Sequence, residues 1–142
     1  MSIFELEDIE KRIQTVYSLN IPFGEEHDFE NGASMIPERD WVCYILRFES
    51  GIYKIGRAYN LKQRRSGYIG DIKYNRTLEG ARNFALIYLI KPKRSNPDQL
   101  ELALTRLCRP YRVKGEYFRG LDKRLEYALS MISEDKKNEL PD

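Results

Sequence analysis

The sequence predicts an α+β domain in which a small central antiparallel sheet of about three strands is flanked by helices. Three observations support this fold class. Short β-branched and aromatic runs alternate with segments whose apolar residues recur at helical spacing. Turn residues separate two of the apolar runs by only a few positions, which is typical of an antiparallel hairpin. A chain of 142 residues is long enough for a single core of modest size.

The first predicted element is a helix over residues 4–19. Ile9 and Ile13 recur at helical spacing on an apolar face, and acidic residues occupy the first turns, where the helix dipole favours them. Residues 20–40 contain two prolines and two glycines, so we expect a linker or an arm there.

A β-hairpin is predicted to follow. The run WVCYILRF, residues 41–48, is β-branched and aromatic, and its alternate residues from Val42 to Phe48 face one side. Residues 49–51, Glu-Ser-Gly, suit a tight turn, and IYKIG, residues 52–56, is the second strand.

The stretch after the hairpin is predicted to be a short helix. Asn60 is a good N-cap for a helix over residues 61–68, and Gly67 and Gly70 are expected to end it. Residues 71–83 are polar and are expected to be irregular.

The remaining elements alternate between strand and helix. FALIYLIK, residues 84–91, is a continuous apolar run and is predicted to be the central buried strand. A helix over residues 97–108 follows, with Pro97 at its first position. VKGEYF, residues 113–118, is a short extended piece, and a last helix covers residues 121–133.

Charge is distributed unevenly along the chain. The net charge of +2 combines −7 over residues 1–40, +12 over residues 41–125 and −3 over residues 126–142. A basic body between acidic flanks favours a polyanionic partner, most simply nucleic acid, over a solvated surface with a chance imbalance. The domain organisation predicted is an acidic N-terminal helix and arm (1–40), a globular domain (41–133) and a polar tail (134–142).

Other features limit the functional classes. No apolar run approaches the ~20 residues that span a bilayer, and the acidic N-terminus lacks an apolar signal core. Cys43 and Cys108 are the only cysteines and lack metal-ligand spacing, so we expect reduced thiols in a cytoplasmic protein. The single histidine, His27, lies in a polar stretch and is expected to be a loop residue.

Four polar residues occupy positions that structure alone does not require. Tyr44 lies on the apolar side of its strand, Lys54 lies inside the second strand, and Arg64 and Glu101 lie near the apolar faces of two helices. A core tyrosine and a partly buried ion pair would explain them structurally. Together, however, a phenol, an ammonium, a guanidinium and a carboxylate are the groups required for metal-assisted phosphodiester cleavage.

The order of three segments resembles the GIY-YIG nuclease superfamily. These segments are VCYIL, then KIGRAYNLKQRRSGY, then LELALTRLCRP. The second and third are similar to the nuclease domain of bacterial excision-repair endonucleases. The closing GEYF, and a lysine in place of the second motif's tyrosine, look like a phage and bacterial subgroup. The resemblance covers roughly residues 41–120 and implies a GIY-YIG fold.

The resemblance also implies a role for each matching residue. Tyr44 would act as the general base or as a relay to it, and Lys54, standing in for the second tyrosine, would hold phosphate or water. Gly56 would let the backbone turn tightly into the following helix. Arg64 would contact the scissile phosphate, and Glu101 would be the sole protein ligand of Mg²⁺ or Mn²⁺.

The expected activity is therefore divalent-metal-dependent hydrolysis of DNA phosphodiester bonds. Besides Lys54, two further departures from the family pattern are visible: Val42 replaces the first motif glycine, and Tyr111 and Arg112 stand near the position where an asparagine often occurs. Specificity would come from a homodimer, the N-terminal arm or a partner protein in a bacterial or phage-infected cell. Residues expected to bind the DNA backbone are Arg57, Asn60, Lys62, Arg65, Arg109, Arg112 and Lys114. The tyrosines that could stack on bases of opened DNA, or could equally be packing residues, are Tyr59, Tyr68, Tyr74 and Tyr111.

Two alternatives stay open at this point. The chain could be a DNA-binding module of the same fold in which Lys54 marks lost cleavage, although a carboxylate such as Glu101 would repel phosphate in a pure binder. It could also be an interaction or inhibitor protein in which the acidic arm does the binding. If the arm covers the basic face, deletion of residues 1–38 is expected to tighten DNA binding.

Overall fold

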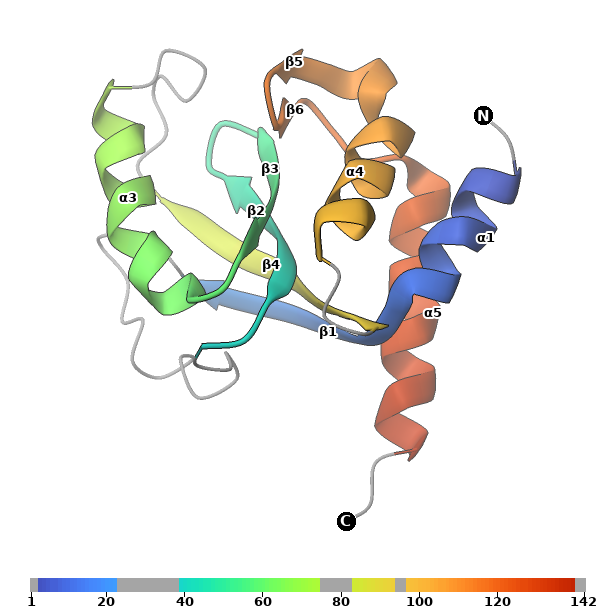
Figure 1. Ribbon diagram of the computed structural model, residues 1–142. Coiled ribbons are helices and arrows are strands. Elements are labelled where there is room, and N and C mark those ends of the chain that lie inside the picture. Colours follow the sequence, from blue (N-terminus) through green and yellow to red (C-terminus); the bar gives the residue numbers. More distant parts are fainter. Residues whose placement is uncertain (1–2, 23–38, 75–82, 94–96, 140–142) are drawn as a thin grey trace.

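The sheet organises the whole molecule. The computed structural model describes residues 3–22, 39–74, 83–93 and 97–139. In this part of the chain, six strands form one antiparallel sheet with the order β1-β4-β2-β3-β6-β5 (Figure 1). The strands are β1 (Ile13–Pro22), β2 (Val42–Phe48), β3 (Tyr53–Ala58), β4 (Phe84–Pro92), β5 (Arg112–Lys114) and β6 (Tyr117–Phe118).

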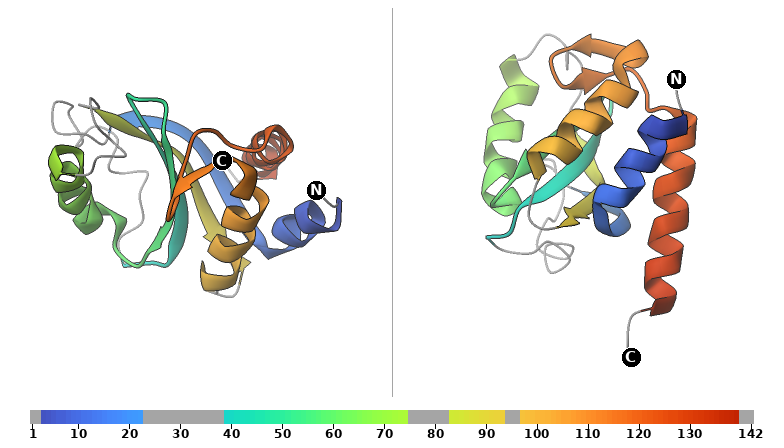
Figure 2. Two further views of the ribbon diagram at one scale, coloured as in Figure 1. Left: turned by 90° about the horizontal axis from the view of Figure 1, so that it is seen from above. Right: turned by 45° about the vertical axis from the view of Figure 1, so that its right-hand side comes forward.

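Helices cover both faces of the sheet. One face carries only α3 among the described helices, while α1, α4 and α5 lie together on the opposite face (Figures 1 and 2). No helix in the described ranges has the length and apolar character needed to cross a membrane. The helices are α1 (Ile3–Arg12), α3 (Leu61–Tyr74), α4 (Pro97–Leu107) and α5 (Lys123–Glu139), with a short 3₁₀ helix η3 (Arg109–Tyr111) after α4.

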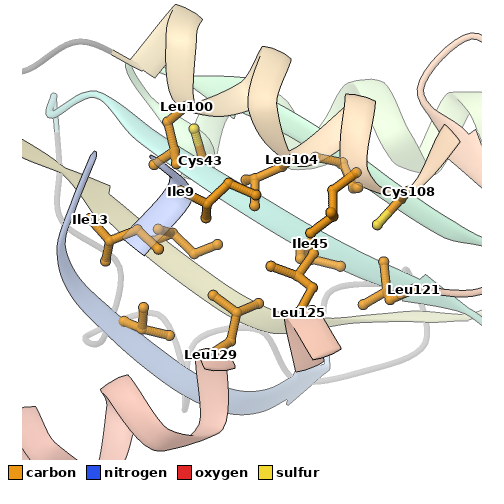
Figure 3. Close-up of a cluster of buried hydrophobic side chains, with 14 of the residues drawn as sticks. Ile9, Ile13, Cys43, Ile45, Leu100, Leu104, Cys108, Leu121, Leu125 and Leu129 are labelled. Atoms are coloured by element: carbon orange, nitrogen blue, oxygen red, sulfur yellow. The ribbon is translucent and has the colours of Figure 1, made fainter. Parts of the chain in front are cut away.

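The alternation of side chains along β2 builds two cores. Cys43 and Ile45 face the core under α1, α4 and α5, whereas Tyr44 and Leu46 face the core under α3, and all four are fully buried. The predicted hairpin of β2 and β3 is confirmed, and Gly51 adopts the positive φ of 88° that its turn requires. Figure 3 shows the larger core, in which the labelled side chains are Ile9, Ile13, Cys43, Ile45, Leu100, Leu104, Cys108, Leu121, Leu125 and Leu129.

The predicted first helix is wrong in its second half. Helix α1 ends at Arg12, and Ile13–Pro22 form β1, which pairs antiparallel with β4. Ile13 and Val16 are β-branched and suit a strand, and the open edge of β4 supplies the hydrogen-bond partners that decide the outcome.

This correction changes how the acidic arm must be tested. Ile9 and Val16 are buried in the larger core, so deletion of residues 1–38 would remove a helix and an edge strand as well as the arm. Residues 23–38 lie outside the described residues. Charge-neutralising substitutions, which leave α1 and β1 in place, are therefore the sounder test of that hypothesis.

Helix α3 is longer than predicted. It begins at Leu61 as expected, and the side chain of Asn60 accepts a hydrogen bond from the Gln63 N–H at 3.1 Å, which confirms the N-cap. It then runs to Tyr74, so neither glycine ends it. A glycine inside a helix costs roughly 1 kcal/mol relative to alanine, which lowers stability without dictating a stop.

Gly67→Ala is therefore expected to stabilise the protein. The glycine is exposed in the middle of α3, and a Cβ built on it meets nothing within 4 Å. Alanine should raise the free energy of unfolding by about 0.5–1 kcal/mol through higher helix propensity and a less flexible unfolded chain. Urea unfolding measures this change, and a loss of stability would mean that the site is more crowded than the structure indicates.

The C-terminal half adds strands that the sequence did not predict. VKGEYF folds into the small hairpin of β5 and β6, with Gly115 at φ 54° in its turn, so the sheet has six strands in place of about three. Helix α4 is confirmed from Pro97, but α5 begins at Lys123 and continues past residue 133. Its N-terminus is capped by Asp122, whose Oδ1 accepts a hydrogen bond from the Arg124 N–H.

Candidate active site

A cleft opens beside β3, beyond the residues that pair with β6. Strand β6 pairs only with Tyr53 and Lys54 of β3, and the Ile55 N–H donates to the Glu116 carbonyl at 3.1 Å. In the described part of the chain, no strand pairs with the rest of this edge, so groups from both sheet faces meet around it. The resulting cleft has a volume of about 510 Å³ and is lined by Trp41, Tyr44, Arg57, Ala58, Tyr59, Asn60, Gln63, Arg64, Glu101 and Glu116.

The α4 side of the cleft presents a carboxylate held by an arginine. Glu101 lies on the buried face of α4, and its side chain is only 10% exposed. Its Oε1 accepts a hydrogen bond from Arg57 Nη1 at 3.0 Å, while Arg57 Nε lies 2.9 Å from Asp98 Oδ1. The guanidinium of Arg57 therefore bridges two carboxylates of α4.

Glu101 has a second acidic neighbour. Glu116, in the turn between β5 and β6, shares a side-chain hydrogen bond with it. Burial, together with the charge and hydrogen bond of Glu116, raises the pKa of Glu101 to about 7, although Arg57 and Lys54 oppose the shift. Burial also acts to raise the pKa of Glu116, but its bond to Lys54 outweighs this and the pKa lies below its usual value. The two carboxylates therefore differ, because burial favours the protonated form of Glu101 while the ion pair with Lys54 keeps Glu116 ionised.

Lys54 acts through Glu116. Its ammonium forms an ion pair with Glu116 Oε2 and lies 5.0 Å from the centroid of the Tyr117 ring. Lys54 is 7% exposed and is not among the residues that line the cleft. The lysine that replaces the motif tyrosine therefore holds the Glu116 carboxylate in place. It would act on a bound phosphate only through Glu116.

The α3 side of the cleft presents a phenol and a guanidinium. The Tyr44 hydroxyl bonds to the Tyr68 hydroxyl, and both rings are buried. The Arg64 guanidinium lies 5.9 Å from the Tyr68 ring centroid and hydrogen-bonds the Tyr44 hydroxyl. Burial nevertheless raises the pKa of Tyr44 above its ordinary value, with Arg64 opposing the shift. Tyr44 is therefore a neutral phenol at physiological pH.

Gly56 has a different structural role from the one expected. It lies inside β3, opposite Tyr44 in the ladder, and it has no positive φ, so it does not form the turn into α3. A Cβ at this position would stand 2.5 Å from the Tyr44 hydroxyl oxygen and 2.6 Å from Cζ. The glycine makes room for the tyrosine ring.

A second cleft extends the site in the opposite direction. It has a volume of about 530 Å³ and shares Arg57, Glu101 and Glu116 with the first, so the two clefts meet at the carboxylate pair. Its other arginines come from the end of α4, from η3 and from β5. They are Arg106, Arg109 and Arg112.

The residues predicted from sequence fall into three groups. Tyr44, Arg64 and Glu101 line one cleft, while Arg109 and Arg112 line the other. Asn60 lines the first cleft but uses its side-chain oxygen to cap α3. Neither cleft is lined by Lys62, Arg65 or Lys114.

Two tyrosines expected as possible base-stacking groups also differ in placement. Tyr68 is 3% exposed and serves the core, while Tyr111 is 40% exposed. The side chain of Tyr74, named with them, lies outside what the structure describes.

Sequence reasoning missed two residues of the site. Glu116 belongs to GEYF, and it is the single acid between Glu101 and Asp122 in a basic stretch. That isolation was the available signal. Trp41 was counted as the first residue of a strand, and its place at the mouth of the cleft depends on the register of the hairpin, which sequence does not give.

The donor chemistry fits a hard divalent cation. Among the described residues, no group of three or more His, Cys, Asp or Glu side chains is placed to hold a metal. Glu101 and Glu116 nevertheless offer two carboxylates side by side on the lining of both clefts. Mg²⁺ commonly binds through one or two carboxylates and completes its shell with water and substrate phosphate.

Comparison with known proteins leaves the family assignment as a prediction. No protein-family model, curated protein or solved structure matches the chain. The resemblance to GIY-YIG nucleases therefore depends on the motifs alone.

Proposed function

We propose that this protein is a divalent-metal-dependent DNA endonuclease of the GIY-YIG type. The observation that supports this best is the convergence of Tyr44, Arg64 and Glu101 on one cleft. They come from β2, α3 and α4, and from opposite faces of the sheet. A packing role would not require a phenol, a guanidinium and a carboxylate to meet at an opening toward solvent.

Each side chain has a part in the proposed hydrolysis. Arg64 binds a non-bridging oxygen of the scissile phosphate and stabilises the charge that develops there. Glu101 and Glu116 hold the divalent cation, which when bound supplies Lewis-acid polarisation of the phosphate. Lys54 keeps the Glu116 carboxylate in place through its ion pair.

Tyr44 is better suited to relay a proton than to act as a phenolate base. Its raised pKa keeps the hydroxyl protonated at neutral pH. The hydroxyl can orient the attacking water, receive its proton and pass its own proton to solvent in the open cleft, while the leaving oxygen takes a proton from solvent. The bond to the Tyr68 hydroxyl holds the phenol in place.

A second candidate function has one observation in its favour. Because Arg57 already bonds to Glu101, the guanidinium could stand permanently where a metal would bind. The protein would then bind DNA through its two clefts without cutting it. Cleavage assays separate the two functions directly.

Arg64→Ala is expected to lower nicking of supercoiled plasmid in Mg²⁺ or Mn²⁺ by about 100-fold or more, as for loss of a transition-state donor. Arg65→Ala is the matched control, because it removes the same group from the next position of α3 but from neither cleft. Its loss should stay within about fivefold, the range of one peripheral phosphate contact. Equal losses of nicking in the two variants would contradict the role assigned to Arg64. If the wild type shows no metal-dependent nicking, the DNA-binding module is favoured instead.

A further inference from the structure

The mouth of the first cleft carries an exposed aromatic pair. Trp41 and Tyr59 are 39% and 48% exposed, and their ring centroids lie 5.5 Å apart at an interplanar angle of 50°. Single exposed aromatic residues are ordinary on protein surfaces. Two in contact, beside two arginines and a pair of carboxylates in one cleft, require a more specific explanation.

The pair is built on a rigid support. Val42 and Ala58 form the last pair of the β2–β3 ladder, so Trp41 and Tyr59 are the next residues on the two strands. Tyr59 also directly precedes Asn60, the N-cap of α3. The rings are therefore held between the end of a sheet and the start of a helix, which suits a preformed binding surface.

The catalytic groups separate this aromatic surface from a basic one. The carboxylate pair lies where the two clefts meet, with Trp41 and Tyr59 in the first cleft only and three arginines, Arg106, Arg109 and Arg112, in the second only. A strand that crosses both clefts would have its phosphates held by arginines on one side of the carboxylates. On the other side it would meet, besides Arg64 at the scissile phosphate, flat aromatic faces that bind bases.

We propose that Trp41 and Tyr59 stack on an unpaired base next to the scissile phosphate, so that the substrate is single-stranded or locally opened DNA. In an intact duplex each base stacks on its neighbours, and its faces are not available to a protein ring. At a single-stranded end, flap or bubble those faces are free. This inference rests on the proposed nuclease function for the identity of the ligand, but stacking itself can be measured without cleavage.

The chain supplies its own probe for the test. Trp41 is the only tryptophan in the sequence, so all tryptophan fluorescence comes from the proposed stacking site. A Glu101→Gln variant, which should bind DNA without cutting it, is titrated with a 20-nucleotide single strand, the blunt duplex of that sequence, and the duplex with a single-stranded overhang. Anisotropy of labelled copies of the same DNAs, in separate titrations, measures binding independently.

The expected result is strong quenching by the single strand and by the overhang DNA, and little quenching by saturating blunt duplex. Trp41→Ala and Tyr59→Ala should each weaken single-strand binding about 10-fold, whereas Trp41→Phe, which keeps a ring, should weaken it much less. Equal fluorescence responses to the three DNAs, or unchanged affinity in both alanine variants, would overturn the proposal.

Cleavage of the same DNAs by the wild type distinguishes the two levels of inference. Metal-dependent cleavage of blunt and overhang DNA at equal rates, with no quenching, would overturn stacking and leave the nuclease in place. Quenching by single strands without any cleavage would support the stacking site and count against the nuclease.

Discussion

Replacing Glu101 by glutamine is expected to abolish cleavage and, at the same time, to make the folded protein more stable at pH 8. The activity should fall by at least about 100-fold, because the substitution removes the charged ligand of the divalent cation. Glutamine keeps the shape of the side chain. Its carbonyl can still accept from Arg57, and its amide can donate to Glu116, so both contacts of Glu101 survive without the charge.

The gain in stability follows from the sign of the pKa shift. The pKa of Glu101 is about 7 in the folded protein against an ordinary value of 4.5. The folded state therefore binds this proton more tightly than the unfolded state, so stability falls as pH rises from about 4.5 to about 7. Above pH 7 the carboxylate is ionised in both states and the loss is complete. Glutamine has no proton to lose and avoids it.

Urea unfolding at pH 5 and pH 8 measures this difference. The variant should exceed wild type at pH 8 by on the order of 1 kcal/mol, and the gap should shrink at pH 5. Asp98→Asn is the control, because Asp98 also pairs with Arg57 from α4 but is 69% exposed. It should change stability little at either pH. A wild type that is the more stable protein at pH 8 would show that the Arg57 pair outweighs the burial of the carboxylate.

Gly56→Ala is expected to destabilise the protein and to remove its activity. The new Cβ would overlap the Tyr44 ring, which is fully buried and is bonded at its tip to Tyr68. Overpacking of this kind typically costs about 1–3 kcal/mol. Any ring movement that relieves the overlap also displaces the hydroxyl from the cleft, so residual cleavage should be very low.

A double-mutant cycle isolates this cause. In a Tyr44→Leu background, the Gly56→Ala substitution should cost less than it does in the wild type, because the overlapping ring atoms are gone. Gly67→Ala serves as the matched control, since the same chemical change in α3 is expected to stabilise. Additive costs for Tyr44→Leu and Gly56→Ala would mean that the glycine is needed for the backbone and not for the ring.

Local signals in the sequence predicted the local parts of this fold. The β2–β3 hairpin, the Asn60 cap and the start of α4 at Pro97 each depend on a few neighbouring residues, and all three are confirmed. The segment Ile13–Pro22 was misassigned because its apolar residues fit a helix and a strand about equally well. Pairing with β4, far along the chain, decided between them.

The site shows the same division between local and distant information. Tyr44, Arg64 and Glu101 were predicted from motif positions, and they line one cleft. The three ion pairs of the site could not be predicted. Arg57 was expected to face phosphate but bonds to carboxylates of α4, and Lys54 was expected to act directly but pairs with Glu116. Both outcomes depend on how α4 and the β5–β6 turn approach β3.

The pairing of β1 with β4 has a consequence for how the chain folds during synthesis. Val16 leaves the ribosome long before its partner Ile90, while the β2–β3 hairpin can form as soon as its own residues emerge. The apolar side of β1 therefore stays unpaired until β4 has been synthesised. Pairing between segments far apart in the chain also carries a loop-closure cost that local pairing avoids. During that time the unpaired strand is exposed to mispairing with another nascent copy, which is the kind of exposure that chaperones limit.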